Sequence, residues 1–336
     1  MTPIFIVGAD RSGTTLLRVM LVQHPDIAIP PESHFVPRLW RRRRRYAKRG
    51  LLTKPARFLE ALEAEPRFRK WKLPIGAVRE ELSTGRSGTF VDALAAPFRA
   101  YARTQDKQRW GDKTPSYAEH VALLDRLWPD AQFIHVIRDG RDVALSVADL
   151  PKQLHKHPAS AAPSWARRVR HARAAARMGE KRYREVFYED LVANPRDVLE
   201  QICNFLGVTF DPRMLDHANG ALEHVPEQER KRHSRLSLPP TIGLRDWRSQ
   251  MRPSDVREFE AIAGRELSAL GYERATTTVR SKDRFVAWSK VAGFMIGSPV
   301  ARLRLRISVK RKTATSRPTE DPSFDSEPET AIQSRR

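Results

Sequence analysis

Short apolar runs, each followed by a polar or glycine-containing turn and then by a helical pattern, recur along much of the chain. The runs occupy residues 4–7, 133–137 and 185–188 and are rich in β-branched and aromatic side chains, which is typical of strands buried on both faces. A weaker run at 27–29 predicts a further short strand, and apolar side chains at helical spacing within 14–23 predict the helix before it. Buried strands that alternate with helices predict an α/β fold with a parallel sheet flanked by helices.

The long stretch between the second and third of these strands follows a different pattern. Residues 35–108 are rich in Arg, Leu, Ala and Glu and are interrupted near Pro55, Pro74 and Gly85. This composition predicts a mainly helical insertion in the α/β fold. We therefore expect residues 1–275 to form one α/β domain.

The C-terminal part of the chain changes character twice. Residues 276–312 include an aromatic and apolar stretch, 284–296, and a basic stretch, 302–312. Such a segment predicts contact with a membrane interface, and a core-packing face is the alternative interpretation of its aromatic side chains. Residues 313–336 are rich in Ser, Thr, Pro and Glu without hydrophobic periodicity, so we expect them to be disordered.

The chain is strongly basic, with a formal net charge of +21 over 336 residues. Residues 41–49 carry +7 and residues 302–312 carry +6, so two short segments supply most of the excess. The five consecutive arginines of the first segment suit an acidic acceptor, an anionic lipid or a nucleic acid. A mean hydropathy of −0.56 and a charged fraction of 30% exclude a membrane-spanning bundle.

Two features bear on the cellular compartment. The single cysteine, Cys203, excludes a disulfide within the chain and suits a reducing compartment. The N-terminal residues contain neither a basic leader nor an apolar run of the length of a signal peptide. We therefore expect a cytoplasmic protein whose C-terminal segment adds peripheral contact with a membrane.

The turn after the first strand, Gly8-Ala-Asp-Arg-Ser-Gly-Thr-Thr15, has a G-x-x-x-x-G frame between a buried strand and a helix. Backbone N–H groups of such a loop and the positive end of the following helix bind anions. Thr14 stands where the P-loop of nucleotide hydrolases has lysine, Thr15 keeps the hydroxyl position, and Arg11 lies inside the loop. The loop therefore predicts phosphate binding without the cation that assists ATP or GTP hydrolysis.

A second strand-loop-helix turn follows residues 133–137 and carries Arg138 and, farther along its helix, Ser146. Each of the two turns thus combines an arginine with a hydroxyl residue. An arginine fork suits phosphate geometry. Two such turns predict a ligand with two separate anionic ends.

At these residues the chain resembles a known family. Residues 11–17, RSGTTLL, resemble the 5′-phosphosulfate-binding loop of sulfotransferases that use 3′-phosphoadenosine-5′-phosphosulfate (PAPS). Residues 17–26, 31–38 and 133–146 are similar to segments of tyrosylprotein and bacterial carbohydrate or lipid sulfotransferases. The resemblance covers about residues 1–272 and implies a P-loop-like sheet and PAPS as the sulfuryl donor.

The resemblance also implies roles for individual residues. Glu32 matches the catalytic base, and Lys113, within Gly111-Asp-Lys-Thr-Pro115, matches a lysine that approaches the transferring sulfuryl group. Arg138 and Ser146 match the residues that bind the 3′-phosphate, and Tyr188 matches a tyrosine near the cofactor. The implied donor-binding set is Arg11, Ser12, Gly13, Thr14, Thr15, Arg138, Ser146 and Tyr188.

The chemistry of sulfuryl transfer agrees with these candidates. In-line transfer to an alcohol needs a base for the acceptor proton and cations near the transferring oxygens, roles that Glu32, Arg11 and Lys113 can fill without a metal. His34 stands where the aligned tyrosylprotein relatives have arginine, a departure that bears on acceptor recognition, and a solvated loop histidine is the alternative interpretation. For Arg141 we expect a solvated ion pair with a neighbouring aspartate.

Three functions are weighed on this basis. The first is a PAPS-dependent sulfotransferase acting on a hydroxyl of a glycolipid, a carbohydrate or another alcohol, with a lipid-linked acceptor as the leading hypothesis. The second is a P-loop kinase-like phosphotransferase, against which Thr14 argues. The third is a basic module that binds nucleic acid or a membrane, and it leaves both anion-binding turns unexplained. We therefore predict a sulfotransferase and no nucleic-acid partner.

Overall fold

The computed structural model describes residues 2–84, 88–149, 157–238, 245–275 and 281–292. The predicted disordered segment 313–336 and most of the predicted interfacial segment 276–312 lie outside these residues. Among the described helices, none is long and apolar enough to cross a membrane.

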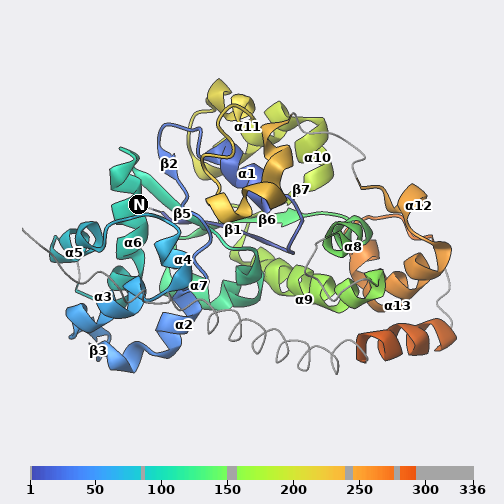
Figure 1. Cartoon of the computed structure of the whole chain (residues 1–336), viewed down its shortest axis with the longest axis horizontal. Helices are drawn as coiled ribbons and strands as arrows, with labels where there is room; N and C mark the ends of the chain where they lie inside the picture. Colours follow the sequence, from blue (N-terminus) through green and yellow to red (C-terminus); the bar gives the residue numbers. More distant parts are fainter. Residues whose placement is uncertain (1, 85–87, 150–156, 239–244, 276–280, 293–336) are drawn as a thin grey trace, which may run out of the picture. The chain divides into compact units, whose positions relative to one another are not determined.

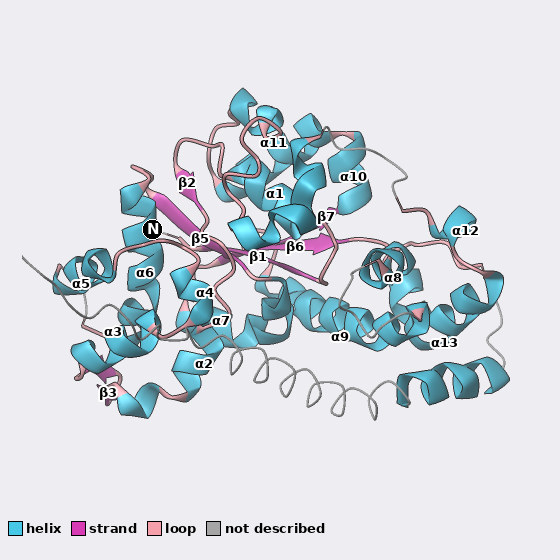
Figure 2. Cartoon of the chain, viewed as in Figure 1, coloured by secondary structure: helices cyan, strands magenta, loops and turns pink. Residues whose placement is uncertain are grey.

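A five-stranded sheet with the strand order β2-β5-β1-β6-β7 forms the centre of the fold, and each pair of neighbouring strands is parallel (Figure 2). The predicted α/β class is therefore confirmed. One central strand was missed by the pattern analysis, because its sequence, Arg-Trp-Gly-Asp-Lys, is mostly polar. The strands are β1 (Ile4–Gly8), β2 (Ile27–Ala28), β5 (Arg109–Lys113), β6 (Gln132–Ile137) and β7 (Tyr183–Phe187).

The period of two along β1 distributes its side chains between two hydrophobic clusters. Phe5 and Val7 pack with the helical insertion, and Ile4 and Ile6 pack with α1 (Thr14–Leu21) on the opposite face. All four side chains are fully buried, which explains why the strand reads as a continuous apolar run. Burial of each such side chain contributes roughly 1.5–3 kcal/mol, so the two clusters hold the strand firmly in the middle of the fold.

Helices cover both faces of the sheet. Figure 1 shows α1, α10 and α11 on one side and α6, α7 and α9 on the other. A third cluster joins α9 to α8 and α13 through side chains that include Trp165 and Phe259. The bounds are α7 (Val121–Leu127), α8 (Gly140–Ala148), α9 (Ala162–Arg173), α10 (Tyr188–Ala193), α11 (Pro195–Leu206), α12 (Trp247–Gln250) and α13 (Pro253–Ala269).

The insertion between β2 and β5 is mainly helical, as the composition predicts. A short antiparallel pair, β3 (Ala47–Lys48) with β4 (Leu51–Leu52), departs from this prediction. Its strands are two residues each, too short for periodicity to reveal. The helices of the insertion are α2 (Val36–Arg41), α3 (Pro55–Glu63), α4 (Pro66–Arg69), α5 (Ile75–Ser83) and α6 (Phe90–Thr104).

Parallel pairing places the carboxyl ends of all five strands at one edge of the sheet, where open α/β sheets bind ligands. The turns that leave this edge carry most of the residues singled out by sequence. Short 3-10 segments complete the surroundings: η1 (Arg43–Arg45), η2 (Pro115–His120), η3 (Pro158–Ala161), η4 (Ala174–Met178), η5 (Pro212–Asp216) and η6 (Glu227–Ser237).

Candidate active site

The turn from β1 into α1 depends on a glycine for two reasons. Gly13 has φ 91°, in the left-handed region that favours glycine. A Cβ at this position would lie 2.3 Å from the ring of Tyr188, which follows β7. The tyrosine therefore packs directly on the backbone of the anion-binding turn.

The two anion-binding turns predicted from sequence touch each other. The Nε of Arg11 donates to the Oγ of Ser146 at 3.1 Å, and the Nη1 of Arg138 donates to the carbonyl of Arg11 at 3.4 Å. The guanidinium of Arg138 stacks over the ring of Tyr188, with 4.5 Å to the ring centroid. Residues after β1, β6 and β7 thus form one continuous surface.

Two polar atoms of this surface are buried and have no hydrogen-bond partner among the described residues. They are the Oγ of Ser12 and the Nε of Arg138. Buried donors without partners are costly and call for an explanation. A bound phosphate would satisfy both, so the turns fit a ligand with anionic groups.

Lys113, at the end of β5, links this surface to the base predicted from sequence. Its Nζ donates to Glu32 at 2.7 Å and to the hydroxyl of Thr15 at 3.1 Å. Burial lowers the pKa of Lys113, although the carboxylate of Glu32 opposes this effect. The structure therefore brings the predicted base and the predicted cation into direct contact beside the first turn.

The carboxylate of Glu32 is held by cations on several sides. Burial alone would raise its pKa, but the charge of Lys113 and the hydrogen bond from His34 outweigh burial and place the pKa of Glu32 well below its ordinary value. The Nε2 of His34 lies 2.9 Å from one carboxylate oxygen, and the hydroxyl of Ser116 lies 3.3 Å from its Nδ1. His34 is therefore engaged with the candidate base, and the interpretation of a solvated loop histidine is wrong.

A buried hydrogen-bond network, which sequence reasoning did not find, positions the segment that carries Glu32. Ser33 donates its hydroxyl to Asp112, and its N–H donates to the hydroxyl of Thr114 at 3.1 Å. The hydroxyl of Tyr117 lies 2.8 Å from the Oγ of Ser33. Burial raises the pKa of Asp112 to about 6, partly offset by hydrogen bonds from Ser33 and Thr114. The only available sequence signal was adjacency to Glu32 and Lys113.

Arg141 forms the expected ion pair with a neighbouring aspartate, but it is fully buried, so the prediction that the pair is solvated is wrong. It forms a bidentate pair with Asp139 and a 2.7 Å pair with Glu260 of α13, and it stacks against Trp247 at 3.6 Å to the ring centroid. Helix α13, which covers Arg141, is more than a hundred positions away in the sequence. Sequence spacing therefore could not reveal that Glu260 is a partner of Arg141. The pair connects α13 to the turn that carries Arg138.

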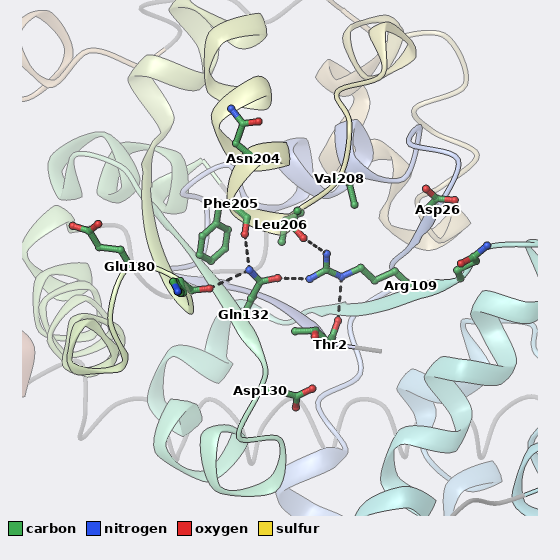
Figure 3. Close-up of a pocket in the computed structure, with 13 residues that line it drawn as sticks. Thr2, Asp26, Arg109, Asp130, Gln132, Glu180, Asn204, Phe205, Leu206 and Val208 are labelled. Carbon is green, nitrogen blue, oxygen red and sulfur yellow. Dashed lines mark hydrogen bonds between the residues drawn. The ribbon is translucent and has the colours of Figure 1, made fainter.

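A cavity with a volume of about 770 Å³ lies at the opposite edge of the sheet (Figure 3). Arg109 and Gln132 cross it, and their side chains bond to each other. Arg109 also donates to the carbonyls of Thr2 and Leu206, and Gln132 donates to the carbonyl of Phe205. The side chains of Arg109 and Gln132 are therefore already engaged in hydrogen bonds around this cavity.

Comparison with known proteins agrees with this geometry. A family model described as "Sulfotransferase family" matches residues 3–212. The sulfotransferase domain of the Synechococcus PCC 7002 olefin synthase is similar in structure, with a TM-score of 0.57 and 30% identity over 81% of this chain and 95% of that domain. A sulfotransferase domain from the curacin biosynthetic pathway shares the fold, with a TM-score of 0.53 and 23% identity over 81% of this chain and 98% of that domain.

Among curated sequences, a protein-tyrosine sulfotransferase of Drosophila melanogaster is 27% identical over 81% of this chain and 52% of its own length. The chain therefore spans about half the length of that relative. With the family model covering more than half of the sequence, the chain belongs to the sulfotransferase family, and the predicted family resemblance is confirmed.

Proposed function

We propose that the protein is a sulfotransferase that moves a sulfuryl group from PAPS to a hydroxyl of its acceptor. The observation that carries this proposal is the meeting of two anion-binding turns with the Lys113–Glu32 pair at one edge of the sheet. PAPS, when bound, supplies an activated sulfuryl group on its 5′-phosphate and a separate 3′-phosphate. Family membership supports the same reaction.

The donor's two anionic ends suit the two turns. In this proposal the backbone N–H groups of residues 11–15 and the hydroxyls of Ser12, Thr14 and Thr15 bind the 5′-phosphosulfate end. Arg138 and Ser146 bind the 3′-phosphate, and the unpartnered Nε of Arg138 supports this role. Tyr188 packs on Gly13 and supports the shape of the first turn.

The reaction itself needs a proton acceptor and positive charge. Glu32 takes the proton of the acceptor hydroxyl, and Lys113 and Arg11 hold positive charge where negative charge develops. The cations belong to side chains, so turnover should be unchanged after removal of divalent metals with EDTA. A large loss of turnover that added Mg²⁺ restores would contradict this part of the proposal.

For acceptor and location we propose a carbohydrate, lipid-linked or other alcohol acceptor and a cytoplasmic enzyme at the membrane surface. Residues 281–292 are helical, and Ala287 and Val291 bury one face of this helix. Phe285 is 77% and Trp288 50% exposed. Exposed aromatic side chains beside basic residues suit a membrane interface.

Calorimetric titration with 3′-phosphoadenosine-5′-phosphate (PAP), ADP and Mg²⁺-ATP at fixed salt tests the donor class. We expect PAP to bind at least tenfold more tightly than either other nucleotide. We also expect Arg138→Ala to weaken PAP binding by at least tenfold, because a buried cation of the second turn is lost. A preference for Mg²⁺-ATP would favour the kinase-like alternative and overturn the proposal.

A further inference from the structure

Two cations of the helical insertion meet an acidic side chain close to the candidate base. The Nη1 of Arg67, in α4, is 3.7 Å from a carboxylate oxygen of Glu32 and 3.1 Å from the Oε1 of Glu229. The Nζ of Lys70 lies 2.5 Å from the same oxygen of Glu229. One carboxylate oxygen of Glu229 therefore accepts from both cations next to the reaction centre.

Glu229 reaches this position from a distant part of the chain. It belongs to η6, 162 positions from Arg67. Burial opposes its ionisation, but the hydrogen bond and charge of Lys70 outweigh burial and lower the pKa of Glu229. The side chain is therefore an anion at neutral pH, held by a small cationic site.

Without Glu229, the site formed by Arg67 and Lys70 would carry a net positive charge. Glu32 already pairs with Lys113 at 2.7 Å and with His34 at 2.9 Å. If Glu229 moved away, Arg67 would retain only the shared and longer contact to Glu32. Lys70 has no other acidic partner among the described residues. Two positive charges close to the base would then lack this counter-ion.

The segment that carries Glu229 packs on the cluster around α1 and α11 through a partly buried side chain, Leu236. None of the described side chains of η6 is buried, and the segment has non-helical backbone angles at His233. Segments with few buried apolar contacts and mostly exposed polar ones detach at low cost. The ion pair itself is partly exposed, with 34% of the Arg67 side chain accessible, so another anion can replace Glu229.

We propose that Arg67 and Lys70 form a binding site for an anionic group of the acceptor, and that Glu229 occupies this site until the acceptor binds. The inference rests on the proposed function, since it defines the acceptor as an alcohol that also carries a carboxylate, sulfate or phosphate. The planar fork of Arg67 suits a planar or tetrahedral oxyanion, and Lys70 adds a second point charge.

Geometry limits the spacing within such an acceptor. Its hydroxyl must lie within hydrogen-bond distance of Glu32, and its anionic group within the same distance of Arg67. Since Arg67 and Glu32 are 3.7 Å apart, the two groups of the acceptor lie no more than about 10 Å from each other.

Binding of matched probes to the PAP-loaded protein tests the site without requiring turnover. The probes are 4-hydroxyphenylacetate and its methyl ester, which differ by one negative charge and place it within the allowed distance of the hydroxyl. We expect calorimetry at low salt to show at least tenfold tighter binding of the acid. Arg67→Gln should reduce this preference below threefold, and Lys70→Arg should keep it.

Glu229→Gln distinguishes an anion site that Glu229 occupies from an ion pair that only stabilises the fold. Removal of the competing carboxylate should tighten binding of the acid severalfold and leave the ester unchanged. The matched control is Arg69→Gln, which removes an equal charge from an exposed position of the same helix, α4. This variant should bind the acid and the ester as the original protein does. Weaker binding of the acid by Glu229→Gln would overturn the proposal.

The two hypotheses fail in different ways. Equal binding of acid and ester by a protein that binds PAP normally would overturn the anion site and leave the proposed function intact. Absence of PAP binding, with the acid preference preserved in the PAP-free protein, would overturn the donor assignment and leave the anion site. Where the probes are also sulfated, the acid-to-ester ratio of kcat/KM should follow the binding ratio.

Discussion

The pairing of Glu32 with Lys113 defines the chemistry available at single residues. A carboxylate with a lowered pKa is ionised at neutral pH but is a weak base while the cation pairs with it. Lys113 also donates to Thr15 in the anion-binding turn. An anionic group of a ligand bound in that turn would also attract Lys113. The pKa of Glu32 would then rise, which would make Glu32 a stronger base.

Glu32→Gln should therefore separate turnover from donor binding. We expect turnover to fall about 10²–10⁴-fold, as is typical when a general base is lost. PAP affinity should be unchanged or slightly higher, because Lys113 no longer pairs with a carboxylate. Glu60→Gln, which removes an equal charge from an exposed position of α3, is the control. Initial rates of PAP release and calorimetry measure the two effects, and turnover within threefold of the original protein would remove Glu32 from the role of base.

Gly13→Ala tests the close approach of Tyr188 to the first turn. The added Cβ would lie 2.3 Å from the tyrosine ring at a position with φ 91°, so either the turn or the ring must shift. We expect PAP affinity to fall at least tenfold. Gly50→Ala is the matched control, because Gly50 also has positive φ, 83°, but has no atom within 4 Å of an added Cβ. Equal PAP affinity in both variants would contradict this account of the turn.

At the scale of elements, strand β5 and the segment after β2 act as one unit. Asp112 of β5 accepts from the hydroxyls of Ser33 and Thr114, and all three side chains are fully buried. Lys113 lies between two members of this network and Glu32 precedes a third. The network therefore sets the distance between base and cation.

The pKa of Asp112 makes this unit sensitive to pH. Burial raises it from 3.8 to about 6, so the folded state favours the protonated carboxyl. Stability should fall as pH rises from about 4 to about 6, because ionisation of Asp112 costs more in the folded than in the unfolded state. The shift corresponds to about 3 kcal/mol.

Asp112→Asn removes the titrating group at this position. Urea unfolding between pH 4 and 7 should show that the stability of the original protein decreases relative to the variant across this range. A difference that stays constant with pH would show that Asp112 does not titrate there.

At the scale of the whole molecule, our proposal assigns membrane contact to the helix of residues 281–292. Lys290 of this helix pairs with Glu258 of α13 at 2.6 Å. The side chains of Phe285 and Trp288 are exposed. The basic residues 302–312 follow in the sequence and favour an anionic membrane.

The double variant Phe285→Ser/Trp288→Ser should weaken binding to vesicles of anionic phospholipid at least tenfold in a sedimentation assay, because the apolar contact with the interface is lost. Added salt should weaken binding of the original protein as well. Leu51→Ser, which removes another large apolar side chain that is 52% exposed, is the control. Unchanged vesicle binding by the double variant would contradict a role of the aromatic pair.

The sequence by itself determined the local features of the fold. Apolar runs marked β1 and β6, because a strand buried on both faces is apolar almost throughout, and a shorter apolar run marked the end of β7. The glycine frame and the alternation of strands and helices determined the fold class and the family. The family resemblance, and not the strand pattern, assigned Glu32 and Lys113, which are 81 positions apart, to one site.

Only the tertiary structure decided which polar groups pair. The polar strand β5 became central because β1 and β2 supply its hydrogen-bond partners. Arg141 is buried because α13 covers it, and Glu229 meets Arg67 because η6 returns to α4. Periodicity reports burial within one element, whereas the partner of a charge depends on the path of the whole chain.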